Sequence, residues 1–393
     1  YILFMPFYGR MADTFGTRTL MLIGVGVYAA GSTVCLVAPS MAFVFVGRFI
    51  QASGAACLNP LSLSIITRCF PPESRGHALG TWNATGPFTG TIGPVVGGFL
   101  IDAFGWRIVF LPVVTAAIVS VFIVRALIPP MRNERRTRSA KFDWPGMALT
   151  GIALTSFILF LSSRPVTGRA PFTDWRLLLV FLGSATGWFL WERHRRVPFV
   201  AVSLFKRRQF ALAAICVSVR MFYLGTVNFL VPLYAADVLN ADASVTGLAV
   251  AANAAALLLT MRLGGAIADR FSRRYPVRVG MFGQAAILFW FAVSPGDTVP
   301  WLIVPVMLHG ALAGLSLASL HHIAMHEVPP EDSGAGAGTY SMSRFFGNLV
   351  GASLMGVVLE FWLRRAEDIG GAYRLTFLVA AVVGDRKSTR LNS

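Results

Sequence analysis

Long apolar runs follow one another along almost the whole chain, and they limit its fold more than any other feature. We count thirteen such segments, most of them close to the roughly 20 residues that a helix needs to cross about 30 Å of hydrocarbon. Membrane β-strands are about ten residues long and alternate in polarity, which these runs do not. The sequence therefore predicts an all-α protein that crosses the membrane many times. The segments are 1–9, 19–37, 41–66, 78–101, 108–128, 146–163, 175–192, 210–235, 245–268, 278–294, 301–325, 337–362 and 373–384.

The composition excludes most other classes of protein. Hydrophobic residues make up 55% of the chain and charged residues only 13%, whereas soluble domains carry about 25% charged residues. A soluble enzyme, a disordered chain and a disulfide scaffold are therefore excluded. The four cysteines lie in or beside apolar runs without a CxxC pair, and the six histidines show no metal-ligand spacing. We expect no metal and no cofactor.

The net charge of +16 is best explained by basic loops beside membrane helices. Lys and Arg gather in alternate connections, which places 10–18 and the other basic connections in the cytoplasm. The connection at 326–336 departs from this pattern, because it holds Glu327, Glu331 and Asp332 without a basic residue. No basic stripe is interleaved with aromatic residues, so we expect no nucleic-acid partner. Nearly all basic residues are arginine, which suggests a bacterial gene and a location in the inner membrane.

Both ends of the chain depart from the pattern of complete spans. Residue 1 is Tyr and lies inside an apolar run, so we expect the native start to be missing. The last nine residues, DRKSTRLNS, interrupt a span that has barely begun. We expect segment 385–393 to be of non-native origin, with a short native cytosolic tail as the alternative.

Two connections share one pattern of glycine, aspartate and arginine. The first reads GRMADTFGTR and the second GAIADRFSRR, with Gly and Asp four residues apart and Asp and the last Arg five apart in both. Two copies in equivalent places indicate two related halves, as in many transporters. A carboxylate there can face a helix N-terminus or an arginine, and such a contact can open and close as the halves move. We predict a conformational latch at Gly9, Asp13, Gly16, Arg18, Gly265, Asp269, Arg270 and Arg274.

These residues resemble the signature loop of the major facilitator superfamily, although Thr14 replaces its usual basic residue. Two further motifs also resemble this superfamily. The stretch from Gly47 to Ala56, with Arg48 and Gln51, is similar to its fourth-span motif. The stretch GTIGPVVGG is similar to the fifth-span antiporter motif, which the resemblance links to helix packing and restricted leak; its residues are Gly90, Gly93, Pro94, Gly97 and Gly98.

The number of spans between the two latch segments indicates a branch of the superfamily. Eight spans lie between them, two more than in a twelve-span transporter, and the extra pair is 146–163 and 175–192. The flanking stretches FDWPG and LFKRRQF resemble those of such a hairpin. The chain thus resembles the fourteen-span drug:proton antiporters, without the first span and with the last one cut short. The expected fold is two pseudo-symmetric six-helix bundles with a two-helix insertion, divided as 1–128, 129–209, 210–384 and the tail.

Charged and titratable residues inside spans are functional candidates, because a charge there is costly. The resemblance implies proton coupling for Arg48, and Gln51 lies one turn away. Arg220 and Arg344 have three open interpretations: binding of an anionic substrate group, pairing with an acid from the missing span, or hydrogen bonding between helices. His309 is a candidate proton carrier with a structural role as the alternative, and we expect His321 and His322 at the membrane interface. No carboxylate is central, so no acid is named as the proton carrier.

The resemblance implies a monomeric secondary transporter that exports small drug-like or cationic molecules in exchange for protons. Alternating access of the two halves is the expected mechanism. No phosphate-binding GxxxxGK[ST] sequence is present, so nothing supports direct use of ATP. The alternatives are a metabolite importer or uniporter, a membrane sensor that transports nothing, a membrane-embedded enzyme, and an inactive truncated product.

Overall fold

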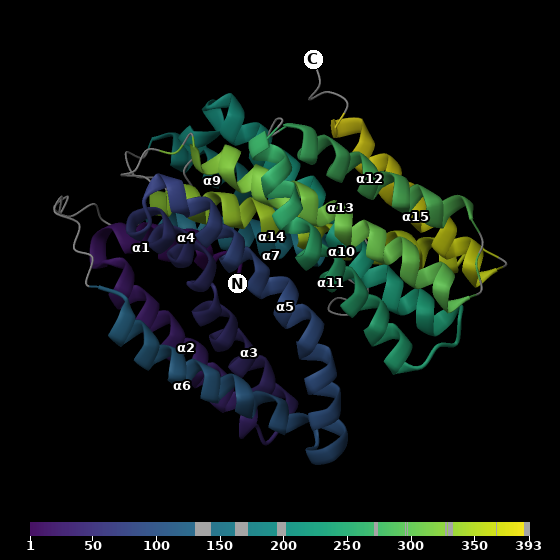
Figure 1. Cartoon of the computed structure of the whole chain (residues 1–393), viewed down its shortest axis with the longest axis horizontal. Coiled ribbons are helices and arrows are strands. Elements are labelled where there is room, and N and C mark those ends of the chain that lie inside the picture. Colours follow the sequence, from purple (N-terminus) through teal and green to yellow (C-terminus); the bar gives the residue numbers. More distant parts are fainter. Residues whose placement is uncertain are drawn as a thin grey trace.

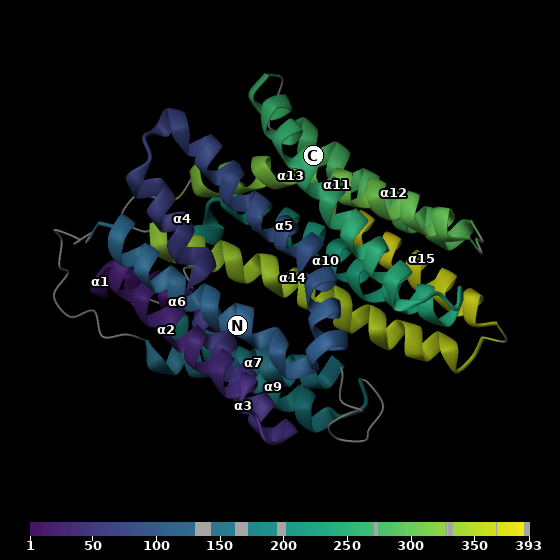
Figure 2. The ribbon, with the colours of Figure 1, turned by 60° about the horizontal axis from the view of Figure 1, so that its bottom comes forward.

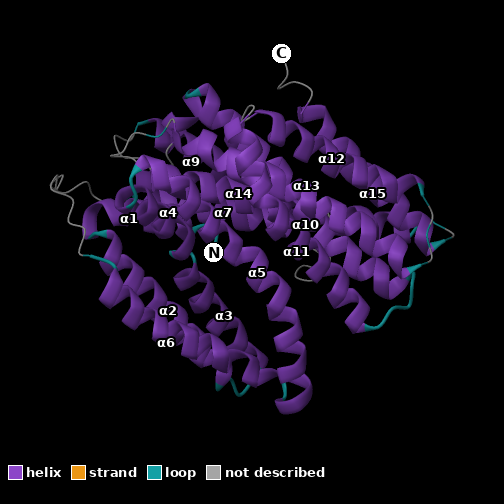
Figure 3. Cartoon of the chain, in the orientation of Figure 1, coloured by secondary structure: helices purple, strands orange, loops and turns teal. Residues whose placement is uncertain are grey.

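The computed structural model describes residues 1–129, 143–161, 172–194, 202–270, 274–294, 296, 298–326, 328, 333–366 and 368–388. Throughout these residues the chain forms helices joined by turns and short connections, without a strand (Figure 3). Nine of the described helical spans are long and apolar enough to cross a membrane, and the apolar helix Ile369–Val383 is shorter. The all-α membrane fold expected from the sequence is confirmed.

The N-terminal half consists of α1 to α6. Its core gathers residues from α1, α2, α4 and α6, among them Met5, Leu20, Leu61 and Ala117. Helix α5 begins at Pro72, which suits the first helical position because its nitrogen has no hydrogen to donate. The bounds are α1 (Phe4–Phe15), α2 (Thr17–Leu36), α3 (Met41–Ala55), α4 (Leu58–Cys69), α5 (Pro72–Phe104), the 3-10 helix η1 (Trp106–Val109) and α6 (Phe110–Leu127).

The C-terminal half consists of α10 to α15, and it holds the largest buried core. In this core Tyr234 packs edge-on against Tyr373, and Phe291 stacks on Phe377 with ring centroids 5.0 Å apart. Leu204 and Phe210 are buried at the start of this half and fix the entry of the chain into α10. The bounds are α10 (Arg208–Asp237), α11 (Ala243–Arg270), α12 (Arg274–Val293), α13 (Val299–His326), α14 (Ser333–Leu363) and α15 (Ile369–Ser388), preceded by the 3-10 helix η2 (Val202–Lys206).

The central hairpin is formed by α7 (Trp144–Leu161) and α9 (Trp175–Arg193), which pack against each other. Helix α7 also contacts α14, where the rings of Phe157 and Phe346 lie 6.1 Å apart. The hairpin therefore packs against α14 through α7. Figures 1 and 2 show most of α1 to α6 on one side of the molecule and most of α10 to α15 on the other, and α14 contacts both α10 and, in the N-terminal half, α1 and α4.

Several predicted boundaries need correction. The segment 10–18 is not a loop: α1 runs to Phe15 and α2 starts at Thr17, so that only Gly16 separates them. Helix α5 starts six residues before the predicted span 78–101, because a helix does not end where its apolar stretch ends. The predicted spans 1–9, 78–101 and 175–192 correspond to α1, α5 and α9, which are helical but are not among the nine long apolar spans.

The C-terminal segment also departs from expectation. Helix α15 does not stop at the polar residues after Gly384 but continues to Ser388. Asp385 therefore does not end the helix, as the sequence pattern had suggested. Residues 389–393 lie outside the described residues, and the non-native origin of 385–393 stays a prediction.

The predicted span 41–66 is a single crossing that is broken in the middle. Helix α3 ends at Ala55 and α4 begins at Leu58. Pro60 accounts for the break, because it has no N–H to donate to the carbonyl of Ala56 four residues earlier. The two pieces place Arg48 and the α4 residues that contact α14 on separate short helices.

Asp143 fixes the start of the central hairpin, and its replacement gives a first test of the fold. Its Oδ1 accepts hydrogen bonds from Gly146 N at 3.1 Å and from Trp191 Nε1 of α9 at 2.8 Å. Asp143→Ala removes a helix cap and a link between α7 and α9, and we expect it to destabilise the protein by about 1–3 kcal/mol. Asp143→Asn keeps an acceptor oxygen and should lose less stability. Thermal unfolding of the two variants in detergent checks this, and an equal loss would contradict it.

Candidate functional site

The first latch segment forms a one-residue turn between two helices. Gly16 has φ 86° and ψ 139°, in the region that residues with a side chain rarely adopt. Just beyond it, Arg18 Nη2 donates a 2.7 Å hydrogen bond to the carbonyl of Arg125, in the last turn of α6. Arg18 thus ties the start of α2 to the C-terminal end of α6, where a positive charge is favourable.

The second latch segment lies on the end of α11 and the start of α12. Gly265 faces Ala318 of α13 at ordinary contact distance, whereas a Cβ on its neighbour Gly264 would overlap the backbone of Leu315. Arg270 ends α11 and Arg274 begins α12. The side chains of Asp13 and Asp269 lie outside the described part of the structure.

Helices α1 and α14 pack in an antiparallel register. The rings of Tyr1 and Phe345 lie 5.1 Å apart, and a Cβ on Gly338 would be 3.1 Å from Pro6 Cα. As α1 proceeds toward its C-terminus, the contacts on α14 thus move toward the N-terminus of α14. The backbone position of Asp13 in the last turn of α1 is therefore directed toward the N-terminal end of α14, where a helix favours a negative charge.

Arg48 is the first member of a hydrogen-bonded chain in the N-terminal half. Its Nη1 donates to Gln51 Oε1 at 3.1 Å, Gln51 Nε2 donates to Ser32 Oγ at 2.8 Å, and Ser32 Oγ donates to the carbonyl of Tyr28 at 2.8 Å. Gln51 and Ser32 are buried, whereas Arg48 is exposed and lies over the ring of Phe110 at 5.0 Å. The hydrogen-bonded chain through Gln51 and Ser32 thus holds the Arg48 guanidinium at the edge of the N-terminal half.

The glycine motif lies on α5, which packs on α11 of the other half. A Cβ on Gly90 would lie 3.7 Å from Ala254 Cβ, whereas Cβ atoms on Gly93 and Gly97 would meet no atom within 4 Å. Gly98 continues the helix, and the side chain of Pro94 lies outside the described residues. The motif therefore begins at the contact between the halves and continues along a helix face with open space.

Two of the titratable candidates of the C-terminal half, Arg220 and His309, lie in its interior. Arg220 is 1% exposed, and its Nε donates to the carbonyl of Ala313 at 2.9 Å. His309 is fully buried, and neither ring nitrogen has a hydrogen-bond partner among the described residues. Arg344 is half-buried on α14, beside α1. The sequence analysis treated these residues, together with Arg48 and Gln51, as candidates for one cavity. The structure separates them, because Arg48 and Gln51 lie in the N-terminal half.

The geometry of the site does not by itself identify a protein family, but comparison with known families does. The family model described as the Major Facilitator Superfamily matches residues 1–215 and 213–384. The chain belongs to this superfamily.

Several relatives of this superfamily member carry names that refer to drug resistance. Multidrug resistance protein Stp of Mycobacterium tuberculosis is 29% identical over 90% of this chain and 65% of its own length. Multidrug resistance protein 3 of Bacillus subtilis is 27% identical over 90% of this chain and 69% of its own. Probable multidrug resistance protein EmrY of Escherichia coli is 27% identical over 92% and 70%. The chain thus spans about two thirds of the length of these proteins.

Solved structures show the superfamily fold. The human organic anion transporter MFSD10 (TETRAN) superposes with a TM-score of 0.69 at 17% identity, covering 98% of this chain and 80% of that protein. The proton:xylose symporter XylE superposes with a TM-score of 0.65 at 13% identity, covering 98% and 83%. At these identities the likeness concerns the fold alone.

Sequence reasoning missed two features of this superfamily chain. Close crossings of α11 with α13 and of α10 with α14 depend on the pairs Gly310 and Gly314, and Gly347 and Gly351, where a Cβ would fall on the neighbouring helix. Their GxxxG spacing is a known signal of close helix packing and was available in the sequence. His321 was expected at the interface but is 2% exposed, with its ring centroid 5.0 Å from that of Tyr340. No sequence signal joins these two residues, because α13 and α14 bring them together.

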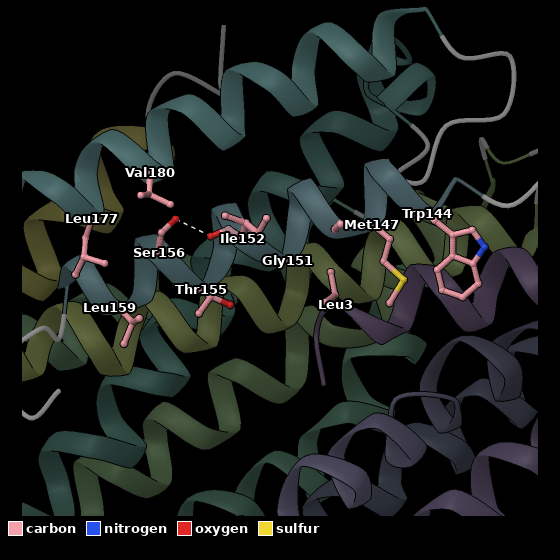
Figure 4. A pocket seen from close by; sticks show the side chains of 11 residues that line it. Leu3, Trp144, Met147, Gly151, Ile152, Thr155, Ser156, Leu159, Leu177 and Val180 are labelled. Carbon is pink, nitrogen blue, oxygen red and sulfur yellow. Dashed lines mark hydrogen bonds between the residues drawn. The ribbon is translucent and has the colours of Figure 1, made fainter. Parts of the chain in front are cut away.

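An apolar groove of about 610 Å³ runs along α7, between α9 and the first residues of the chain (Figure 4). Its lining carries no charged side chain, and the Ser156 hydroxyl is bonded to the carbonyl of Ile152 within the same helix at 2.6 Å. The groove thus offers contact surface to an apolar group. It is lined by Leu3, Trp144, Met147, Ala148, Gly151, Ile152, Thr155, Ser156, Leu159, Leu177 and Val180.

Proposed function

We propose that this chain exports small drug-like molecules across the inner membrane of a bacterium, in exchange for protons. The observation that carries the proposal is the similarity, over 90% or more of the chain, to proteins named for multidrug resistance in three bacteria. Cationic dyes are the first substrates to test.

Alternating access of the two halves is the proposed mechanism, and the contacts between the halves support it. Trp82 of α5 meets His321 near the latch-side end of α13, with ring centroids 6.4 Å apart, and Gly338 meets Pro6 near the same side. Farther along α5, Gly93 and Gly97 face open space. This arrangement corresponds to a state that is closed on the latch side, which the positive-inside rule places in the cytoplasm.

Each predicted site has a role in this proposal. The latch around Asp13 and Asp269 holds the closed state through helix ends, and opens when the halves rock. Arg48 and its buried polar chain couple protonation to that motion. The α5 motif limits leak, and its contact with α11 is at Gly90.

Everted membrane vesicles that contain the full chain test the proposal. With an acidic lumen, a fluorescent cationic dye such as ethidium should accumulate in the vesicles, and an uncoupler should abolish accumulation because the gradient supplies the energy. Vesicles from cells with an empty vector are the control. Dye movement that does not depend on the proton gradient would favour a uniporter or importer instead. An absence of movement across a broad substrate panel would favour a sensor.

A further inference from the structure

Two arginines inside the C-terminal half have no carboxylate partner among the described residues. Arg220 is 1% exposed on α10, and within the described part of the chain it bonds only to the Ala313 carbonyl and, through Nη1, to Met221 Sδ at 3.3 Å. Arg344 on α14 donates no hydrogen bond to a described residue, and its Nε is buried without a partner. Ser218 Oγ of α10 donates a 2.8 Å hydrogen bond to the carbonyl of Ser343 on α14, so Arg220 and Arg344 both lie within one helical turn of this contact between the two helices. Buried positive charge of this kind is costly unless an anion neutralises it.

Further polar atoms without partners lie beside these arginines. The hydroxyl of Tyr340, which is 0% exposed, has no hydrogen-bond partner among the described residues, and Tyr340 precedes Arg344 by one helical turn. His321 directs Nδ1 to the carbonyl of Leu317 at 3.2 Å, and its Nε2 has no partner. A buried donor without an acceptor costs free energy, so an absent group with acceptor atoms fits this cluster.

Aromatic side chains from both halves contact the residues of the cluster or their neighbours. Trp82 of α5 approaches the ring of His321, and the ring of Tyr1 packs edge-on against Phe345, over which Arg344 lies at 5.4 Å. These side chains suit a ligand with a flat apolar body, and the arginines suit its charged end. The cluster lies where the two halves meet, and a transported molecule must pass between them.

We propose that Arg344, Tyr340 and Arg220 form a binding site for the carboxylate of an aromatic organic anion. Arg344 Nε and the Tyr340 hydroxyl donate to the carboxylate, Arg220 contributes charge, and the rings of His321 and Trp82 hold the apolar body. This inference rests on the proposed export function and adds aromatic carboxylates to its substrates.

Binding of salicylate to the purified full chain tests this site, with the neutral isostere salicylamide as the matched ligand. In a gluconate buffer, salicylate should bind to the wild type in calorimetry and raise its Tm, and salicylamide should do neither. We expect Arg344→Gln to abolish binding and Tyr340→Phe to weaken it about tenfold, in line with the loss of one hydrogen bond to a charged group. Arg278→Gln on α12, an exposed arginine outside the cluster, should bind like the wild type.

Tyr340→Phe keeps the test decisive if Arg344→Gln fails to fold. Its lost hydroxyl has no partner among the described residues, so its Tm without salicylate should equal or exceed that of the wild type. Equal salicylate binding by Tyr340→Phe and the wild type, or no binding by either, would overturn the proposal. Chloride that binds in place of salicylate with the same dependence on Arg344 would also overturn it, in favour of an inorganic-anion site. Dye transport is measured separately, so salicylate binding without export would refute only the export function.

Discussion

Replacing Arg48 with alanine is expected to reduce proton-driven dye export strongly while leaving the protein folded. Couplings between sites in proteins are typically about 1–3 kcal/mol, which corresponds to roughly 5- to 150-fold effects, and we expect a loss of at least about tenfold within that range. The effect on stability should be small, because Arg48 is exposed and its described contacts are one hydrogen bond to Gln51 and one ring contact with Phe110.

The measurement is the initial rate of ethidium uptake into everted vesicles at a fixed pH difference, normalised to the amount of folded protein. Arg48→Lys keeps the charge but loses the planar guanidinium, and Arg278→Ala removes an exposed arginine elsewhere as the matched control. Full uptake by Arg48→Ala would show that Arg48 has only a structural role. Gln51→Ala should give an intermediate loss, because it frees the guanidinium from the buried chain through Ser32.

Gly264→Ala is expected to destabilise the protein although it adds only one methyl group. The added Cβ would fall on the carbonyl oxygen of Leu315, where α11 crosses α13. Backbone cannot move aside as the end of a flexible side chain can, so the two helices must separate. Overpacking of this kind costs about 1–3 kcal/mol, and it opposes the gain of up to about 1 kcal/mol that alanine normally brings to a helix.

Gly247→Ala supplies the control on the same helix. A Cβ at Gly247 meets no atom within 4 Å, so this variant gains helix propensity without a clash and should be neutral or more stable. Thermal unfolding of both variants in one detergent should give shifts of opposite sign. A Tm for Gly264→Ala at or above that of Gly247→Ala would show that the crossing is looser than the structure indicates.

Some local features of the structure could be predicted from the sequence and others could not. The Arg48–Gln51 contact was predictable, because both residues lie on one helix three positions apart. The turn at Gly16 was predictable as a break, but its length was not, since nothing in GRMADTFGTR stops the helix before Gly16. Pro60 is visible in the sequence, yet the break that it causes was missed because the apolar run continues through it.

The sequence alone determined the fold class and the resemblance to a transport superfamily, and it predicted the division into two halves with a central hairpin. These properties depend on the length and polarity of local segments and on short motifs, which membrane solvation and helix geometry translate directly into spans. Only the tertiary structure decided that Arg48 lies apart from Arg220 and that His321 meets Tyr340 rather than the membrane interface. Such contacts depend on which helices cross and at what register, and the crossing points are set by close approach at Gly264, Gly310 and Gly347 rather than by any property of the residues that they bring together.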